Sequence, residues 1–478
     1  MSQALTGEHA AERAAPPLHR WRWLALFVVL AAEIMDLLDA LITTIAGPSI
    51  RAGIGGGESL VQWLGAGYTI AMASGLIVGG RLGDMFGRKR MFMIGAAGFT
   101  VASLLCAVAQ SPEMLIGARL LQGLLGAVML PQGLGVIKEI FPPKELGAAF
   151  GAFGPIMGLA AVGGPILAGW LVDANFFGIG WRMIFVINIP VGLLTMLGAA
   201  RLFPASKRST TTRLDLAGAL LATLGTILMI YPLVQGREHG WPAWTFVGMA
   251  ASLAVFAFFG WYESRRDRRG VATLVMPSLF GKRAFTGGLV AGLAFFSALV
   301  GFGLVFTLFV QLGLNYPPLK AGLASVPQAL GMIVGFGIAG AGLSQKLGRT
   351  LIHIGTAITA AGFAVFMLVV DGPDVTVWTM APATAIVGIG LGMAMAPFFD
   401  IVLAGVEEHE TGSAAGTLTA VQQLGGALGV ATLGTVFFSS LTSGFASAIN
   451  AAVWVSLALL AASFALTFLL PMRARPED

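Results

Sequence analysis

Three carboxylates stand close together in the first long apolar stretch of this 478-residue chain. Glu33, Asp36 and Asp39 follow one another at intervals of three residues within 24–48. On a helix this spacing places them on one stripe about 120° wide. A bare carboxylate charge is costly in apolar surroundings, which favours binding a proton. We expect at least one of the three to carry protons across a membrane; the alternative is that one or two only face water in a cavity or bond to neighbouring helices.

Arg119 is the expected partner of these acids. Counting 1.5 Å per residue, Arg119 lies about 9 Å and Asp39 about 8 Å below the outer surface of a 30 Å apolar layer. A buried guanidinium keeps its charge and requires a counter-charge. We therefore expect a pair in which protonation of Asp39 frees Arg119, and in which a cationic substrate competes for the same charge. A purely structural salt bridge is the alternative.

The elements that must hold these residues are membrane helices. The chain is 56% hydrophobic and 11% charged, against about 25% charged residues in soluble domains. One cysteine, Cys106, excludes a disulfide within the chain and any cysteine-based metal cluster. Fourteen apolar stretches are long enough to span a bilayer, which takes about 20 residues: 24–48, 60–82, 91–109, 113–137, 146–172, 182–203, 215–234, 244–263, 284–312, 320–345, 350–370, 377–402, 412–440 and 449–471.

The basic residues predict the orientation of these stretches. If the chain begins on the cytoplasmic side, 23 of its 28 Lys and Arg residues fall in cytoplasmic segments. Only Arg51, Arg182, Arg237 and Lys320 fall outside, and Arg119 lies within a helix. Basic residues accumulate in cytoplasmic loops. We therefore expect a multi-pass protein of the cell inner (plasma) membrane with both termini in the cytoplasm.

An internal repeat divides the chain. The segment GGRLGDMFGR at 79–88 recurs as GAGLSQKLGR at 340–349, an offset of 261 residues. The same offset carries each of the first six stretches onto one of the last six, within a few residues. We expect a substrate site near the membrane midplane between two six-helix halves. The predicted divisions are a tail at 1–23, a first half at 24–210, two additional helices at 211–270, a second half at 271–471 and a tail at 472–478.

Six motifs in order carry a family resemblance: GGRLGDMFGRKR at 79–90, ARLLQGLLGA at 118–127, GLAAVGGPILAG at 158–169, WRMIFVINIPVGL at 181–193, LGLNYPPLKAGLASVP at 312–327 and GTLTAVQQLGGALG at 416–429. Over nearly its whole length the chain resembles the major facilitator superfamily. Within it, the chain is most similar to the fourteen-helix drug:proton antiporters of the EmrB/QacA type. The resemblance implies an all-α membrane protein with 14 transmembrane helices in two pseudo-symmetric six-helix halves plus two central helices.

The first helix departs from the family pattern. Its segment LDALITTIAGP at 38–48 keeps Asp39 and Pro48, but Leu41 replaces the usual Thr and Thr44 the usual Asn. Two polar groups that line the family's cavity are thus altered. We interpret this as a change in substrate preference, with transport retained.

The resemblance also implies a gate. Asp84 and Arg88 of the 79–90 motif are expected to form a charge network that latches the cytoplasmic side. In the second copy Gln345 replaces the acid, while Arg349 matches Arg88. The pair Gly164–Pro165 removes a backbone hydrogen bond and adds a small-residue surface inside a helix. It is expected either to act as a hinge or leak-preventing seal or to form only a packing kink.

Four residues are assigned to the substrate cavity, namely Tyr68, Gln122, Phe302 and Phe306. Aromatic rings suit lipophilic cations, although helix packing explains most of them equally well. Asp400 aligns with Glu139 in the repeat, near the cytoplasmic exits of both helices, and is therefore interpreted as an interfacial residue.

The sequence favours a proton-coupled exporter of small lipophilic drugs or metabolites, cationic ones among them. We expect alternating access driven by the proton gradient, with no cofactor, no metal, no nucleic-acid partner and a functional monomer. No phosphate-binding loop of the GxxxxGK[ST] type occurs, which disfavours ATP-driven transport. An enzyme would normally show a group of metal-binding or nucleophilic residues, and the sequence shows none. A proton-coupled or facilitative importer of a small nutrient, or a lipid flippase, are the alternatives.

Overall fold

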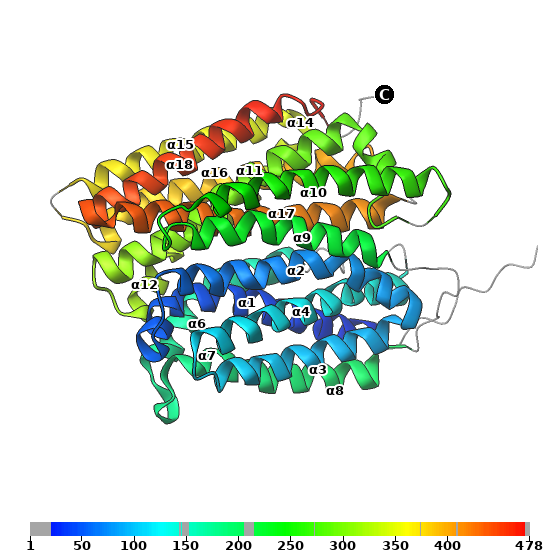
Figure 1. Cartoon of the computed structure of the whole chain (residues 1–478), viewed down its shortest axis with the longest axis horizontal. Helices are drawn as coiled ribbons and strands as arrows, with labels where there is room; N and C mark the ends of the chain where they lie inside the picture. Colours follow the sequence, from blue (N-terminus) through cyan, green and yellow to red (C-terminus); the bar gives the residue numbers. More distant parts are fainter. Residues whose placement is uncertain are drawn as a thin grey trace, which may run out of the picture.

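The computed structural model describes residues 21–142, 145, 153–204, 215–271, 273–372, 374–407 and 410–473. Within these ranges the regular structure is entirely helical, without a strand. The long helices run side by side in an elongated bundle (Figure 1). Most of the predicted N-terminal tail and residues 474–478 of the C-terminal one lie outside the described residues.

The helices of the first part of the chain follow the predicted stretches. A left-handed Gly87, with φ of 95°, makes the tight turn between the second and third helices. Ser111 caps the fourth helix by accepting a bond from the backbone N–H of Met114 at 3.2 Å. The helices are α1 (Arg22–Ile54), α2 (Ser59–Phe86), α3 (Arg88–Ala107), α4 (Pro112–Ile140), α6 (Phe153–Asp173), α7 (Met183–Val186) and α8 (Asn188–Leu202).

The second part of the chain is built in the same way. It contains α9 (Leu216–Gln235), α10 (Ala243–Asp267), the short turn η3 (Pro277–Gly281), α11 (Arg283–Leu308), the π-helical η4 (Phe309–Gly313), α12 (Pro318–Ala324), α13 (Val326–Ile338), the π-helical η5 (Ala339–Leu343), α14 (Ser344–Leu347), α15 (Arg349–Val370), α16 (Val377–Leu403), α17 (Thr411–Ser440) and α18 (Phe445–Thr467).

Two predicted stretches are interrupted helices. The stretch 182–203 divides between α7 and α8, where Pro190 cannot donate the backbone bond that would continue the helix. The stretch 320–345 divides into α12, α13 and α14. Pro327 near the start of α13 and Gly342, with φ of 93°, mark two of the breaks. Periodicity of apolar residues predicts the span but not these interruptions.

Eleven helical runs among the described residues are long and apolar enough to cross a membrane. This confirms an all-helical protein with multiple spans. Helices α1, α2 and α6 occupy three further predicted stretches and lie in the same bundle (Figure 1).

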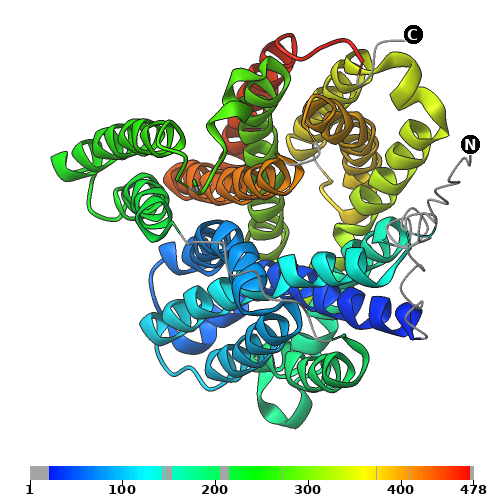
Figure 2. The same ribbon diagram turned by 90° about the vertical axis from the view of Figure 1, so that its right-hand side faces the viewer.

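The long helices form two packed sets. In the first set, α2 and α3 pack on α4, and α1 contacts α6 and α8. In the second, α13 and α15 pack on α16, and α11 contacts α17 and α18. Between the sets, α2 packs on α17, and α6 on α12 and α13. Figure 2, which looks along the helices, shows the first set in blue and cyan below the second in yellow and red.

Glycines of the 79–90 motif let α2 approach α4 closely. A Cβ atom on Gly79 would collide with the backbone of Ala127, and one on Gly83 with the side chain of Gln132. In the space so made, the Gln132 side-chain amide donates to the carbonyl of Gly79 at 2.6 Å. The motif therefore has a packing role in addition to any role of its charges.

Helices α9 and α10 stand at the side of the bundle. They pack on each other, and α9 also contacts α2 and α17 (Figure 2). Of the apolar 18-residue segment by which α10 could cross a membrane, only 11% is buried within the protein. The rest of this helix faces outward, where a membrane protein meets lipid.

Candidate functional site

An ion pair lies at the centre of the first set. Asp39 of α1 and Arg119 of α4 are each 1% exposed, and an Arg119 terminal nitrogen contacts Asp39 Oδ2. The depth estimate from sequence places these two residues at one level, and the structure places them in contact. A buried charge stays charged at low cost only when a partner of opposite charge is in contact with it.

Two side-chain amides complete the surroundings of Asp39. Its Oδ1 atom accepts hydrogen bonds from Asn188 Nδ2 at 2.7 Å and from Gln122 Nε2 at 2.9 Å. Both amides also donate to Ser103 Oγ, at 3.3 and 2.9 Å respectively. The site thus draws on α1, α3, α4 and α8, and its amide donors form charge-assisted hydrogen bonds to the Asp39 carboxylate.

Arg119 has further partners besides the carboxylate. Its Nε atom donates to the carbonyl of Leu64 at 3.3 Å, and a terminal nitrogen donates to Gln122 Oε1 at 2.7 Å. Its guanidinium carbon lies 4.2 Å from the centre of the Tyr68 ring. These contacts would remain if Asp39 lost its charge. None of the groups that make them is negatively charged, so none could replace Asp39 as a counter-charge for Arg119.

Asp36 is linked to the same centre through Tyr68. The Tyr68 hydroxyl donates to Asp36 Oδ1, while the ring of Tyr68 stacks on Arg119. Asp36 is half-buried, whereas Asp39 is fully buried. Tyr68, assigned to the cavity from sequence, therefore bridges one acid and the cation of the other. Its role in substrate contact stays a prediction.

The third acid has the fewest interactions. Glu33 is half-buried, and within the described part of the chain it has no hydrogen bond or ion pair. The three acids on one stripe of α1 thus form a graded series. Asp39 has a cation and two amide donors, Asp36 has one hydroxyl donor, and Glu33 has none.

The two copies of the gate motif use different partners. Arg88 Nε lies 3.4 Å from Glu139 Oε1 at the end of α4. Asp84 is in the last turn of α2, but its side chain lies outside the described residues. Arg349 instead donates to the backbone carbonyls of Phe468 and Leu470 at 3.0 and 2.6 Å. A latch formed by Asp84 and Arg88 stays a prediction.

Gly164 and Pro165 lie where three helices meet. A Cβ atom on Gly164 would come within 3.1 Å of Leu41 of α1. On α12, a Cβ atom on Gly322 would collide with the backbone carbonyl of Pro165. The pair therefore permits close contact of α6 with α1 and with the second set.

The remaining cavity residues are buried within one set or the other. Gln122 is fully buried in the Asp39 network, and Phe302 and Phe306 are 1% and 2% exposed. The ring centre of Phe302 lies 4.6 Å from that of Phe363 on α15. These two phenylalanines thus pack between α11 and α15, and their contact with substrate stays a prediction.

Two polar residues of the centre were not singled out from the sequence. Asn188 lies in the quoted motif WRMIFVINIPVGL, and Ser103 in the stretch 91–109. A side-chain amide inside an otherwise apolar span is costly without a partner. That cost is the signal by which Asn188 would have been identified.

The two sets are tied together at the end that holds the α1–α2 loop. Gln62 Nε2 of α2 donates to the carbonyl of Ala431 in α17 at 3.0 Å. Gln311 Nε2 donates to the carbonyl of Ile45 in α1 at 2.6 Å. A cavity of about 300 Å³ lies between the sets at the same end, and Pro48, Leu308 and Phe438 are among its lining residues.

Comparison with known proteins places this arrangement in a family. The family model of the Major Facilitator Superfamily matches residues 23–430. A probable actinorhodin transporter of Streptomyces coelicolor is 50% identical over 432 residues, which cover 90% of this chain and 75% of the relative. A puromycin resistance protein of Streptomyces alboniger is 37% identical, with 87% and 82% coverage. A tetracenomycin C resistance and export protein of Streptomyces glaucescens is 31% identical, with 87% and 76% coverage.

Solved structures agree on the fold. The crystal structure of an auto-inhibited peptide transporter of the POT family aligns with a TM-score of 0.68 over 95% of this chain and 99% of that chain. The two sequences are 13% identical, so this likeness concerns the fold alone.

Proposed function

Because the chain belongs to the major facilitator superfamily, we propose that it is a proton-coupled exporter that moves small lipophilic compounds out of the cell by alternating access. Membership makes it a transporter rather than an enzyme, as the sequence predicts. The observation that carries the proposal is the buried Asp39–Arg119 pair with its amide donors. Resistance and export functions named for the relatives favour export over import.

The proposal includes fourteen spans in two related six-helix halves, with α9 and α10 as the additional pair. Its support is the agreement of helix bounds at the offset of 261. Helix α1 begins at Arg22 and α11 at Arg283, and α3 begins at Arg88 and α15 at Arg349. The contacts of α2, α3 and α4 are repeated by those of α13, α15 and α16.

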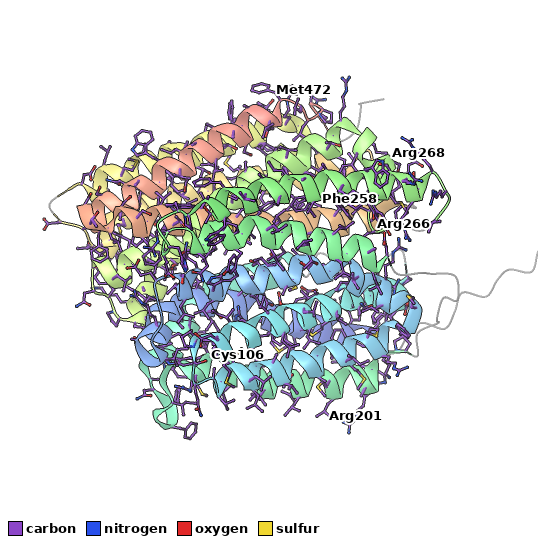
Figure 3. The ribbon with its side chains drawn as sticks, in the orientation of Figure 1. Cys106, Arg201, Phe258, Arg266, Arg268 and Met472 are labelled. Atoms are coloured by element: carbon purple, nitrogen blue, oxygen red, sulfur yellow. The ribbon has the colours of Figure 1, made fainter. Side chains whose placement is uncertain are left out.

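We place both termini in the cytoplasm of a bacterial cell. Arg201, Arg266 and Arg268 lie toward the same end of the bundle (Figure 3). Arg22 at the start of α1 bonds to Glu145 at 2.8 Å, in the connection that follows α4. Concentration of basic residues at one end supports the cytoplasmic assignment of that end. The protein is proposed to work as a monomer without a cofactor.

Proton coupling follows from the graded acids. Glu33 and Asp36 have the fewest donors, and an incoming proton is proposed to reach Asp39 by way of these two acids. When Asp39 is protonated, Arg119 keeps its carbonyl and ring contacts but loses its counter-charge. An unpaired buried charge is unfavourable by several kcal/mol. The conformation in which Arg119 reaches another anion or water is therefore favoured, and the two sets move relative to each other.

Movement between the sets must open the end that the glutamines hold closed. The bonds from Gln62 to α17 and from Gln311 to α1 must break for a compound to leave on that side. The cavity beside them begins at Pro48, nine residues beyond Asp39, or about 14 Å along α1. Its mainly apolar lining suits a lipophilic compound on its exit path.

Transport into everted membrane vesicles tests the proposal. Puromycin and actinorhodin serve as probes, and an acid-inside pH gradient is imposed. We expect gradient-dependent accumulation that collapses with an uncoupler, and that is lost in Asp39→Asn and reduced in Asp36→Asn. Asp400→Asn is the matched control, because Asp400 is an exposed acid of the second set. Accumulation without a gradient, or full activity in both helix-one variants, would contradict the mechanism.

A further inference from the structure

The end of α10 carries a basic hollow that the transport mechanism does not use. A surface cavity of about 320 Å³ is lined by Trp261, Ser264, Arg265, Arg268 and Arg269. Three arginines therefore line one small depression beside a tryptophan. Figure 3 shows Arg268 at this end of the molecule, well separated from Arg201 on α8.

The arginines of the hollow are uncompensated. Arg265 lies over the Trp261 ring, with its guanidinium carbon 5.3 Å from the ring centre. Among the described residues, neither Arg265, Arg268 nor Arg269 forms an ion pair with a carboxylate, although Asp267 is their neighbour in sequence. The hollow is therefore a site of positive potential that would accept an anion.

Neighbouring residues hold this end of α10 in place. Arg266, unlike the other three, pairs with Asp215 at 3.3 Å and donates to the Tyr262 hydroxyl at 2.9 Å. Glu263 accepts bonds from the backbone N–H groups of Leu274 and Val275 at 2.8 and 3.2 Å. The helix end and the returning chain are thus fixed, which lowers the entropic cost of binding at the hollow.

An apolar surface continues from the hollow along α10. Leu253, Phe258 and Trp261 are 65%, 50% and 53% exposed. Phe258 stacks on Trp261 with ring centres 5.4 Å apart, and Figure 3 shows Phe258 nearer the middle of the helix than Arg268. The basic hollow and the apolar face beside it match a ligand that has an anionic head and a long apolar tail.

We propose that the hollow binds the headgroup of an anionic glycerophospholipid of the cytoplasmic leaflet, with the acyl chains along the exposed face of α10. The charge of the three arginines selects an anionic lipid over a zwitterionic one. Trp261 lies in the last two turns of α10, beside these arginines, and tryptophan is a residue type that favours the membrane interface. The proposal rests on the membrane orientation given above and does not depend on proton coupling.

Native mass spectrometry of the detergent-purified full chain tests this site. Phosphatidylglycerol and phosphatidylcholine are added in equal amounts, and the lipid retained per protein is counted. We expect preferential retention of phosphatidylglycerol, and a fall in its apparent affinity of about thirtyfold in the double variant R265Q/R268Q. The charge-keeping variant R265K/R268K is expected to retain most of the preference.

The matched control is R90Q/R201Q, which removes two exposed arginines from the same end of the bundle. It is expected to bind phosphatidylglycerol as the wild type does. An equal loss in both double variants would overturn the proposal, because it would mean that total charge alone attracts the lipid. No preference for phosphatidylglycerol in the wild type, or its full displacement by millimolar inorganic phosphate, would also overturn it.

Discussion

The two helical sets differ most at the positions that the sequence repeat makes equivalent. At the offset of 261, Val300 and Met380 of the second set stand for Asp39 and Arg119 of the first. Ala383 likewise stands for Gln122. Met380 and Ala383 are as deeply buried as their polar counterparts. Val300, by contrast, is 38% exposed, whereas Asp39 is 1% exposed. One set therefore has a buried, hydrogen-bonded ion pair where the other has two buried apolar side chains and an exposed valine.

The difference shows that helix packing and interior chemistry are separable. Both sets place corresponding helices in contact. The first set fills its interior with charges and amides, and the second with a cluster that includes Phe302, Phe306 and Phe363. Close packing of helices depends on side-chain volume and on small residues at the crossings. It therefore survives the exchange of a polar centre for an aromatic one, and we propose that proton coupling depends on the first set alone.

The largest effect is expected when the charged residues of the first set are replaced by the apolar residues at the corresponding positions of the second. Arg119→Met leaves Asp39 buried without a counter-charge, and should abolish transport and lower the free energy of unfolding by about 3–5 kcal/mol. The double variant D39V/R119M removes both charges. It should recover most of that stability, less the cost of the amide donors left unpaired, and remain inactive in transport.

Thermal unfolding in detergent, followed by tryptophan fluorescence, measures both variants. If the double variant were as unstable as the single one, the loss would come from packing and not from the unpaired carboxylate.

Each set has an asparagine whose side-chain amide donates to an aspartate, namely Asn188 in the first set and Asn450 in the second. Asn188→Ala removes a donor from the buried Asp39, and should lower the initial rate of transport about tenfold, since a hydrogen bond to a charged group contributes about 1.5–3 kcal/mol. Asn450 donates to Asp371 at 2.7 Å on the exposed end of the second set. Asn450→Ala should leave the rate unchanged, and equal losses in vesicle assays would refute the assignment of Asn188.

Phe302→Leu tests the aromatic interior of the second set. The change should lower the free energy of unfolding by about 1 kcal/mol, because leucine fills most of the volume of the phenylalanine side chain. We expect altered relative resistance to several drugs, measured as inhibitory concentrations in cells that express the variant. The dependence of transport on pH should stay as in the wild type. A shifted pH profile would mean that the second set takes part in proton coupling.

Glu410 gives the smallest expected effect. The Lys282 ammonium and the Ser278 hydroxyl lower the pKa of Glu410 to about 2. A lowered folded-state pKa gives stability above the unfolded value of 4.5 that is lost as pH falls toward 2. Between about pH 5 and 8 this contribution is constant. Glu410→Gln should therefore lower the thermal midpoint equally at both ends of that range, without changing the pH profile of transport.

Sequence reasoning reached the pairing of Asp39 with Arg119 because the cost of a buried charge is independent of fold detail. The sequence did not identify Asn188 as a partner of Asp39, or Ser103 as the hydroxyl that accepts from Asn188 and Gln122. The spacing of the acids defines one stripe along α1. Which faces of α3 and α8 are turned toward that stripe depends on how four helices pack together. The same limit applies to Phe302 and Phe306, which the structure packs against α15.

The amino-acid sequence by itself determined that this is a multi-span helical membrane protein of the major facilitator superfamily. Apolar length and the motifs are properties of single segments, and they need no knowledge of neighbours. Only the tertiary structure decided how the three acids of α1 differ, since the donors that reach Asp39 and Asp36 come from other helices. It likewise decided that α9 and α10 stand at the side of the bundle, because their apolar length is the same whether protein or lipid covers them.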